Sequence, residues 1–152
     1  MTEAAPKPPL AADLHEMDFH AWARRQAQAM TAREPGALDV ANLIDEVESL
    51  GRSQRAAIES HLSVSILHLL KFRVQPGRAT VSGHVTLRNQ RRDIGRLTTR
   101  SPSLRGYPAE ILAETYRDAR RRAAQETGMD ESAFPDGLPF TLAQILDPDF
   151  VP

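Results

Sequence analysis

The chain contains no cysteine, which excludes a disulfide framework and any metal site built on thiolate ligands. Aromatic residues make up only 5% of its 152 residues. No apolar run approaches the roughly 20 residues that cross a bilayer, and the N-terminus lacks the uninterrupted apolar segment of a signal peptide. These absences favour a soluble cytoplasmic protein that has no thiol chemistry and no contact with a membrane.

The net charge of −1 hides a strong segregation of charge along the chain. Residues 1–70 carry six basic and ten acidic groups, and residues 71–122 carry thirteen basic and four acidic groups. Residues 123–152 carry six acidic groups and no basic group. A basic middle between acidic ends indicates either charge pairing inside the fold or a basic surface that binds a polyanion.

Helical periodicity runs through most of the sequence and predicts an all-α fold. Residues 1–17, which contain three prolines, are predicted to be a mobile leader, and residues 18–152 a single helical domain. The domain is predicted to be a bundle of about five main helices and a short C-terminal helix. The helices are expected to follow the capping residues Asp18, Asp39 and Ser53 and to span residues 81–100, 107–127 and 142–146.

Gly51 is well placed to end the second of these helices, because glycine is the usual residue just beyond a helix C-terminus. Ser53 can then cap the third helix, which leaves a connection of only about three residues. So short a connection favours an antiparallel helical hairpin. In such a hairpin His61 would lie level with Leu43 and within about one turn of Glu46.

Two histidines, His61 and His68, lie seven residues apart on one face of the predicted third helix. A buried imidazole needs hydrogen-bond partners or a lowered pKa, and the hairpin would supply carboxylates. Two histidines at this spacing lie roughly 10 Å apart along the helix, too far apart to bind one metal ion. The candidate polar cluster is therefore a set of hydrogen-bonded core residues, an acid–base site or a metal site with one histidine. Its members are Glu46, Glu48, Arg52, His61, His68 and Lys71.

A second candidate site is a stripe of four arginines, called here the arginine rail, on the predicted helix over residues 81–100. Like charges four residues apart repel each other, and Asp93 is the only acid on this helix to offset them. Compensation must come from elsewhere in the fold, from a partner protein or from phosphates. The rail consists of Arg88, Arg92, Arg96 and Arg100.

Four segments resemble the bacterial family called domain of unknown function 29. They are NLIDEVESLGRSQRAAIESHL (42–62), LHLLKF (67–72), NQRRDIGRLTTRSPSLR (89–105) and FTLAQILDPDFVP (140–152), in that order over nearly the whole chain from Asp18. The resemblance implies an all-helical cytoplasmic bacterial protein from a family without an established activity.

The family pattern singles out one of the two histidines. It resembles acid-acid-x-acid before a leucine-glycine-arginine turn, followed by a histidine before leucine-leucine-lysine and an aromatic residue. His61 stands where the pattern leads us to expect arginine, Phe72 stands where it has tryptophan, and the plain segment 79–84 replaces an aromatic-rich one. The matching positions are Asp45, Glu46, Glu48, Leu50, Gly51, Arg52, His68, Lys71 and Phe72.

These observations favour a small interaction or regulatory module that has no catalytic activity and no cofactor and that acts with a partner protein or a second copy of itself. One alternative is an enzyme in which His68 acts with Glu46, Glu48 or Lys71, with or without a metal ion. The other is nucleic-acid binding through the arginine rail, although no aromatic residues are interleaved with its charges.

Overall fold

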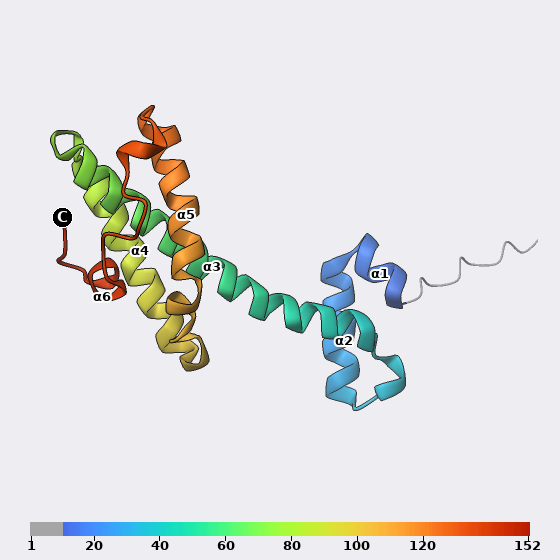
Figure 1. The fold of residues 1–152 in the computed structure, drawn as a ribbon. Coiled ribbons are helices and arrows are strands. Elements are labelled where there is room, and N and C mark those ends of the chain that lie inside the picture. Colours follow the sequence, from blue (N-terminus) through green and yellow to red (C-terminus); the bar gives the residue numbers. More distant parts are fainter. Residues whose placement is uncertain (1–10) are drawn as a thin grey trace, which may run out of the picture. The chain divides into compact units, whose positions relative to one another are not determined.

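A computed structural model describes residues 11–152 of the chain (Figure 1). These residues form helices and connecting turns, and none of them lies in a strand. The longer helices are α1 (Ala11–Met17), α2 (Phe19–Ala32), α3 (Val40–Val74), α4 (Val81–Arg100), α5 (Tyr107–Thr127) and α6 (Leu142–Leu146). Short 3-10 helices are η1 (Pro35–Ala37), η2 (Pro76–Arg78), η3 (Pro102–Leu104) and η4 (Glu131–Ala133).

The predicted all-α class is confirmed, and so are the bounds predicted for α4, α5 and α6. The caps predicted at Asp18 and Asp39 are present as well, whereas the cap predicted at Ser53 is wrong because this residue lies inside α3. Thr141 and Gln144 form a reciprocal capping box at the start of α6, and Gly128 takes the left-handed conformation, with φ of 68°, at the end of α5. Signals of this kind are local in sequence, which is why they can be interpreted without the tertiary structure.

The predicted turn at Gly51 is wrong. Residues 40–74 form one helix, α3, so the expected hairpin between two shorter helices does not form. Glycine inside a helix costs about 1 kcal/mol relative to alanine, which the good helix formers on either side of it outweigh. Gly51 is also not among the residues with a positive φ, so it has none of the backbone geometry of a helix-ending glycine.

The predicted mobile leader needs a correction over its second half. Residues 1–10 lie outside the described part of the chain, and residues 11–17 form α1, which the proline content of the leader had hidden. The segment AADLHEM consists largely of good helix formers. The predicted division into a leader up to residue 17 and one domain from residue 18 stays a prediction.

Contacts divide the chain into two compact units, Met1–Gly51 and Arg52–Pro152. In the N-terminal unit, the side chain of Asp18 caps α2 by accepting a hydrogen bond from its first turn. Two buried side chains of α2 bind Asp39, which precedes α3. Nε1 of Trp22 donates to Oδ2 of Asp39 at 3.2 Å, and the backbone N–H of Asp39 donates to Oε1 of Gln26 at 2.7 Å.

In the C-terminal unit, the part of α3 after Ile58 is buried on most of its surface, as expected for the central helix of a bundle. Side chains from α4, α5 and the segment after α5 pack against it. This core gathers Leu62, Ile66, Leu69, Leu70, Phe72, Leu87, Ile94, Tyr116, Ala119, Ala123, Phe134, Phe140 and Ile145, among others.

Arg91 attaches the C-terminal segment to α4. Its side chain is only 5% exposed, and its guanidinium donates to the carbonyl oxygens of Ile145 (2.7 Å) and Gln144 (3.2 Å) and reaches that of Pro148 (3.5 Å). Carbonyls at the end of a helix have no partner within that helix. Arg91 therefore satisfies the C-terminal end of α6, and Figure 1 shows α6 lying beside α4.

Candidate functional site

The two acids of the predicted polar cluster do not meet the histidines through a hairpin, because α3 has no turn. Glu46 instead binds His15 of α1, whose Nε2 donates to Oε1 of Glu46 at 2.8 Å. Both residues belong to the N-terminal unit. Glu48 and Arg52 have polar contacts of their own. The acid–base site imagined around His68 therefore lacks the arrangement that was to supply its carboxylates.

His61 finds its polar partner on α4. Its Nδ1 donates to Oε1 of Gln90 at 2.5 Å, and its backbone carbonyl accepts a hydrogen bond from the hydroxyl of Ser65 at 2.9 Å. An imidazole bound in this way between two packed helices fixes their register. These contacts give His61 an architectural role in the C-terminal unit.

His68 differs from His61, because its imidazole makes no hydrogen bond with another residue of the described part. Its ring is partly buried and lies 5.9 Å from that of Phe72. Burial lowers the pKa of His68, the charge of Lys71 lowers it further, and Glu126 acts in the opposite direction. The imidazole is therefore predominantly neutral at pH 7. It lines a cavity of about 130 Å³.

This cavity, called here the His68 pocket, lies where α3 ends and α4 begins. Its walls are His68, Lys71, Phe72, Gln75, Arg78, Thr80 and Gly83. No carboxylate lines it. Nζ of Lys71 donates to Oε2 of Glu126 on α5 at 3.1 Å, which leaves the positive charge of Lys71 partly balanced from outside the pocket.

An apolar groove of about 280 Å³ lies in the N-terminal unit between α2 and the beginning of α3. Val47 and Leu50 line it with exposed fractions of 66% and 69%, and Phe19 and Met30 are about half exposed. Its one charged lining residue is Glu46, whose carboxylate binds His15. The lining consists of Phe19, Trp22, Ala23, Gln26, Ala27, Met30, Leu43, Glu46, Val47 and Leu50.

Gln26 is an unusual residue for this groove, because its side chain is 2% exposed and its Nε2 has no hydrogen-bond partner. The orientation of the amide follows from its neighbour, since Oε1 accepts from the backbone N–H of Asp39. Nε2 is therefore the free donor. An unpaired buried donor costs on the order of 1–3 kcal/mol, which a ligand with an acceptor at this point would recover.

All four members of the arginine rail are exposed. Arg92 pairs with Asp93 at 3.3 Å, whereas the other three form no ion pair with any residue from 11 to 152. A shallow depression of about 310 Å³ runs along Arg92, Arg96 and Arg100. The rail therefore faces solvent in this unit and receives no internal compensation beyond Asp93.

A larger cleft of about 650 Å³ lies between α3 and α5. Two carboxylates and two guanidiniums line it together with one alanine, two serines and one glutamine. The charged residues are Glu59, Asp118, Arg121 and Arg122. Arg121 pairs with Asp118 at 3.7 Å, and Arg122 donates to the hydroxyl of Ser63 at 3.2 Å. The opposite charges of this cleft balance one another, so the cleft prefers neither an anionic nor a cationic ligand.

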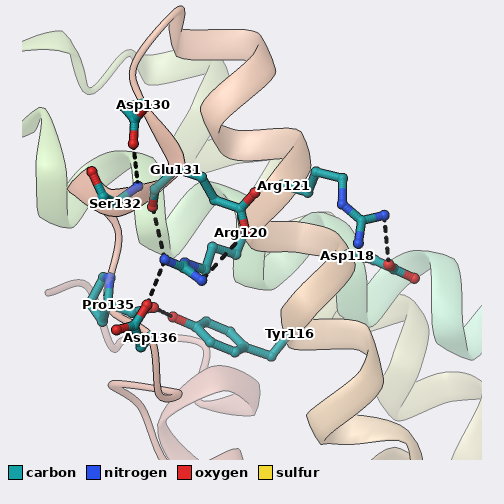
Figure 2. A network of polar contacts seen from close by, with 9 residues as sticks. All are labelled: Tyr116, Asp118, Arg120, Arg121, Asp130, Glu131, Ser132, Pro135 and Asp136. Atoms are coloured by element: carbon teal, nitrogen blue, oxygen red, sulfur yellow. Dashed lines mark hydrogen bonds and ion pairs between the residues drawn. The ribbon is translucent and has the colours of Figure 1, made fainter.

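The arginines in the second half of α5 are only partly solvated (Figure 2). Arg120 reaches over to the segment after α5, where it pairs with Glu131 at 3.4 Å and Asp136 at 2.8 Å. Beside it, the hydroxyl of Tyr116 donates to the carbonyl of Pro135. Together these contacts hold the segment after α5 against that helix.

The comparison with protein families gives one result. The sequence model of a family described as "Domain of unknown function DUF29" matches residues 14–151. The chain belongs to the DUF29 family. No curated protein and no solved structure matches it significantly.

The family assignment of this DUF29 protein confirms the resemblance seen in its sequence and brings no activity with it. In the described part of the chain, no three His, Asp or Glu side chains are grouped so that they could hold a metal ion. None of the helices described is long and apolar enough to cross a membrane.

The groove is the part of the candidate site that sequence reasoning missed. Its signal was present, because Gln26 is a polar residue on the apolar stripe of α2 between Trp22 and Met30. The His68 pocket was anticipated only through His68 and Lys71. Arg78 and Thr80 complete it from a turn whose direction the sequence does not reveal.

Proposed function

We propose that this DUF29 protein is a protein-interaction module that binds an amphipathic helix of a partner in the groove of the N-terminal unit. The supporting observation is the exposure of the groove's apolar side chains, above all Val47 and Leu50. On α3 the exposed apolar positions continue to Val40 and Ile44, which gives the spacing of a helix face that packs against another helix. Contiguous exposed apolar surface of this kind marks interaction sites.

The charge of the surrounding residues favours a basic partner. From Val40 to Gly51, α3 carries three carboxylates and no basic residue, and residues 1–51 contain nine acidic against four basic groups. A helix whose apolar stripe is flanked by lysine or arginine would match both the groove and its rim. A second copy using the same face would instead bring like charges together.

Gln26 adds a requirement for the side chains of the partner helix. Its free Nε2 lies among the apolar residues that line the groove and can donate to an oxygen of the bound helix. The partner segment should therefore place a side-chain amide, hydroxyl or carbonyl oxygen opposite this donor. Such a contact contributes orientation as well as affinity.

The test uses two synthetic amphipathic peptides with the same leucine stripe, one flanked by lysine and one by glutamate. Trp22 is the single tryptophan of the chain and lines the groove, so its fluorescence reports binding to a tryptophan-free peptide. We expect the lysine peptide to bind at least tenfold more tightly. Val47→Asn should weaken that binding about fivefold, which corresponds to roughly 1 kcal/mol of lost apolar contact.

Val85→Asn is the matched control, because Val85 is also a helical valine that is about half exposed but lies in the C-terminal unit. Equal binding of the two peptides, or equal effects of the two variants, would overturn the proposal. Sedimentation of the protein alone tests whether a second copy of this chain occupies the groove. A dimer that Val47→Asn dissociates would assign the face to a second copy of this chain in place of a partner helix.

A second candidate function, nucleic-acid binding, rests on the exposure of the arginine rail. Phosphate contacts predict retention on immobilised DNA or RNA that falls steeply with salt. The double variant Arg96→Gln, Arg100→Gln should then elute at lower salt than the variant Arg117→Gln, Arg121→Gln, which makes the same change of charge on α5. Elution of both variants at the same salt concentration would rule out the rail as the contact.

A further inference from the structure

The His68 pocket has walls that packing holds in place. A Cβ atom added to Gly83 would lie 3.1 Å from Cζ of Phe72, so this glycine allows the first turn of α4 to approach the last turn of α3. The ring of His84 stacks on Phe72 with a centroid distance of 4.6 Å. The Thr80 hydroxyl caps α4 by accepting from the Gly83 backbone at 3.0 Å.

The ionisable side chains that line the His68 pocket are all basic. These side chains are His68, Lys71 and Arg78, and carboxylates are absent from the lining. Arg78 is exposed and has no ion pair within residues 11–152. Lys71 has Glu126 as a partner, but the guanidinium of Arg78 and the ring nitrogens of His68 remain available to a ligand. The pocket therefore offers hydrogen-bond donors and positive charge.

These donors narrow the ligand class. A metal cation needs several lone-pair ligands, and His68 is the one imidazole among the lining residues, next to two cationic side chains. The volume of about 130 Å³ corresponds to roughly four water molecules, which is enough for a phosphate-sized group but not for a larger apolar ligand. Arginine and lysine are the usual partners of such oxyanions.

We propose that the His68 pocket binds a phosphate-sized oxyanion, either as the free ion or as the phosphomonoester group of a small molecule. Arg78 and Lys71 supply the charge, and His68 donates a hydrogen bond from one ring nitrogen. The pocket opens at the beginning of α4, where the helix dipole adds to the same preference. This site lies in the C-terminal unit and is independent of the partner-binding groove.

The pKa of His68 can report whether phosphate binds in the His68 pocket. The groups that face or influence its ring are Lys71 on α3, Arg78 in η2 and Glu126 on α5. Bound phosphate adds negative charge beside the ring and, by linkage, must raise the pKa of His68 by as much as protonation strengthens phosphate binding. His61, which binds Gln90, should not respond in the same way.

The experiment titrates the full chain with inorganic phosphate and follows the His68 ring and the Gly83 amide by NMR, with sodium chloride holding ionic strength constant. We expect saturable shifts at both positions. Arg78→Gln should weaken the affinity at least fivefold. Arg105→Gln, which changes another exposed arginine beside a 3-10 helix, should leave it unchanged.

Methyl phosphate distinguishes the two sources of the oxyanion. Comparable binding of methyl phosphate would assign the site to a phosphomonoester, and binding of inorganic phosphate alone would assign it to the free ion. The absence of saturation, an equal response to chloride, or an affinity unaffected by Arg78→Gln would overturn the proposal. A lower affinity in both arginine variants would also overturn it, because it would indicate a general effect of net charge.

Discussion

Arg91 and Arg92 are neighbours on α4 but have different roles. The guanidinium of Arg91 is buried against the carbonyls at the end of α6, while Arg92 points to solvent and pairs with the adjacent Asp93. Composition alone cannot separate them, because the distinction depends on where residues 144–148 lie. The consequence for stability follows from burial: one guanidinium satisfies backbone acceptors that water reaches poorly, and the other forms a screened surface pair.

Arg91→Met should therefore lower the free energy of unfolding by about 2 to 4 kcal/mol, since it leaves buried carbonyls without donors. Arg92→Met, the matched control, should change it by less than about 0.5 kcal/mol. Urea denaturation followed by circular dichroism measures both values. Losses of equal size would contradict the role assigned to Arg91.

The lowered pKa of His68 should make the stability of the folded chain depend on pH. The pKa of His68 in the folded chain is lowered, mainly by burial, so the unfolded chain takes up the proton first as the pH falls below about 6.5. Stability is therefore lost on acidification, with a slope from this group of at most about 1.4 kcal/mol per pH unit. Unfolding of the chain between pH 7.5 and 5 should show this slope, and His68→Asn should reduce it. An unchanged slope would exclude His68 as its source.

At the scale of elements, the sequence was informative wherever a helix end is marked by its own residues. Thr141 with Gln144 and Gly128 are examples, because their capping interactions are local. Gly51 shows the limit of this reasoning. A glycine between two helical stretches fits both a helix end and a helix interior, and here the helix formers on either side of Gly51 continue the helix through it.

Gly51→Ala tests that element directly. A Cβ at this position would meet no atom within 4 Å, so alanine should stabilise the continuous α3 by about 0.5 to 1 kcal/mol. Gly128→Ala is the opposite case, since φ at Gly128 is 68°, and it should cost about 1 kcal/mol. Thermal unfolding of the two variants should show midpoint changes of opposite sign. A lower midpoint for Gly51→Ala would instead support the turn predicted from the sequence.

At the scale of the whole molecule, the candidate site was harder to predict than the fold. Helical class and most helix bounds depend on periodicity, which any one segment displays by itself. The groove, the pocket and the partner of His61 depend on which faces of separate helices meet. His68 and Lys71 could be singled out because both match the family pattern in one short segment, whereas Arg78 could not, since it reaches the pocket from a turn.

The division into two compact units leads to a prediction about cooperativity. In the N-terminal unit, the described residues that are buried are Trp22, Gln26 and Ala29, whereas the C-terminal unit has an extensive apolar core. Because stability follows the apolar area removed from water, the N-terminal unit should unfold first. Its apolar groove lacks a covering partner in the chain as described, which lowers its stability further.

Trp22 makes this difference measurable, since it is the single tryptophan of the chain and lies in the N-terminal unit. In urea, its fluorescence should change at a lower concentration than the helical circular dichroism, which arises mostly from the C-terminal unit. The lysine-flanked peptide should raise the fluorescence midpoint and leave the second transition in place, because it binds one unit only. Coincident transitions without peptide would instead support the single domain over residues 18–152 that the sequence predicts.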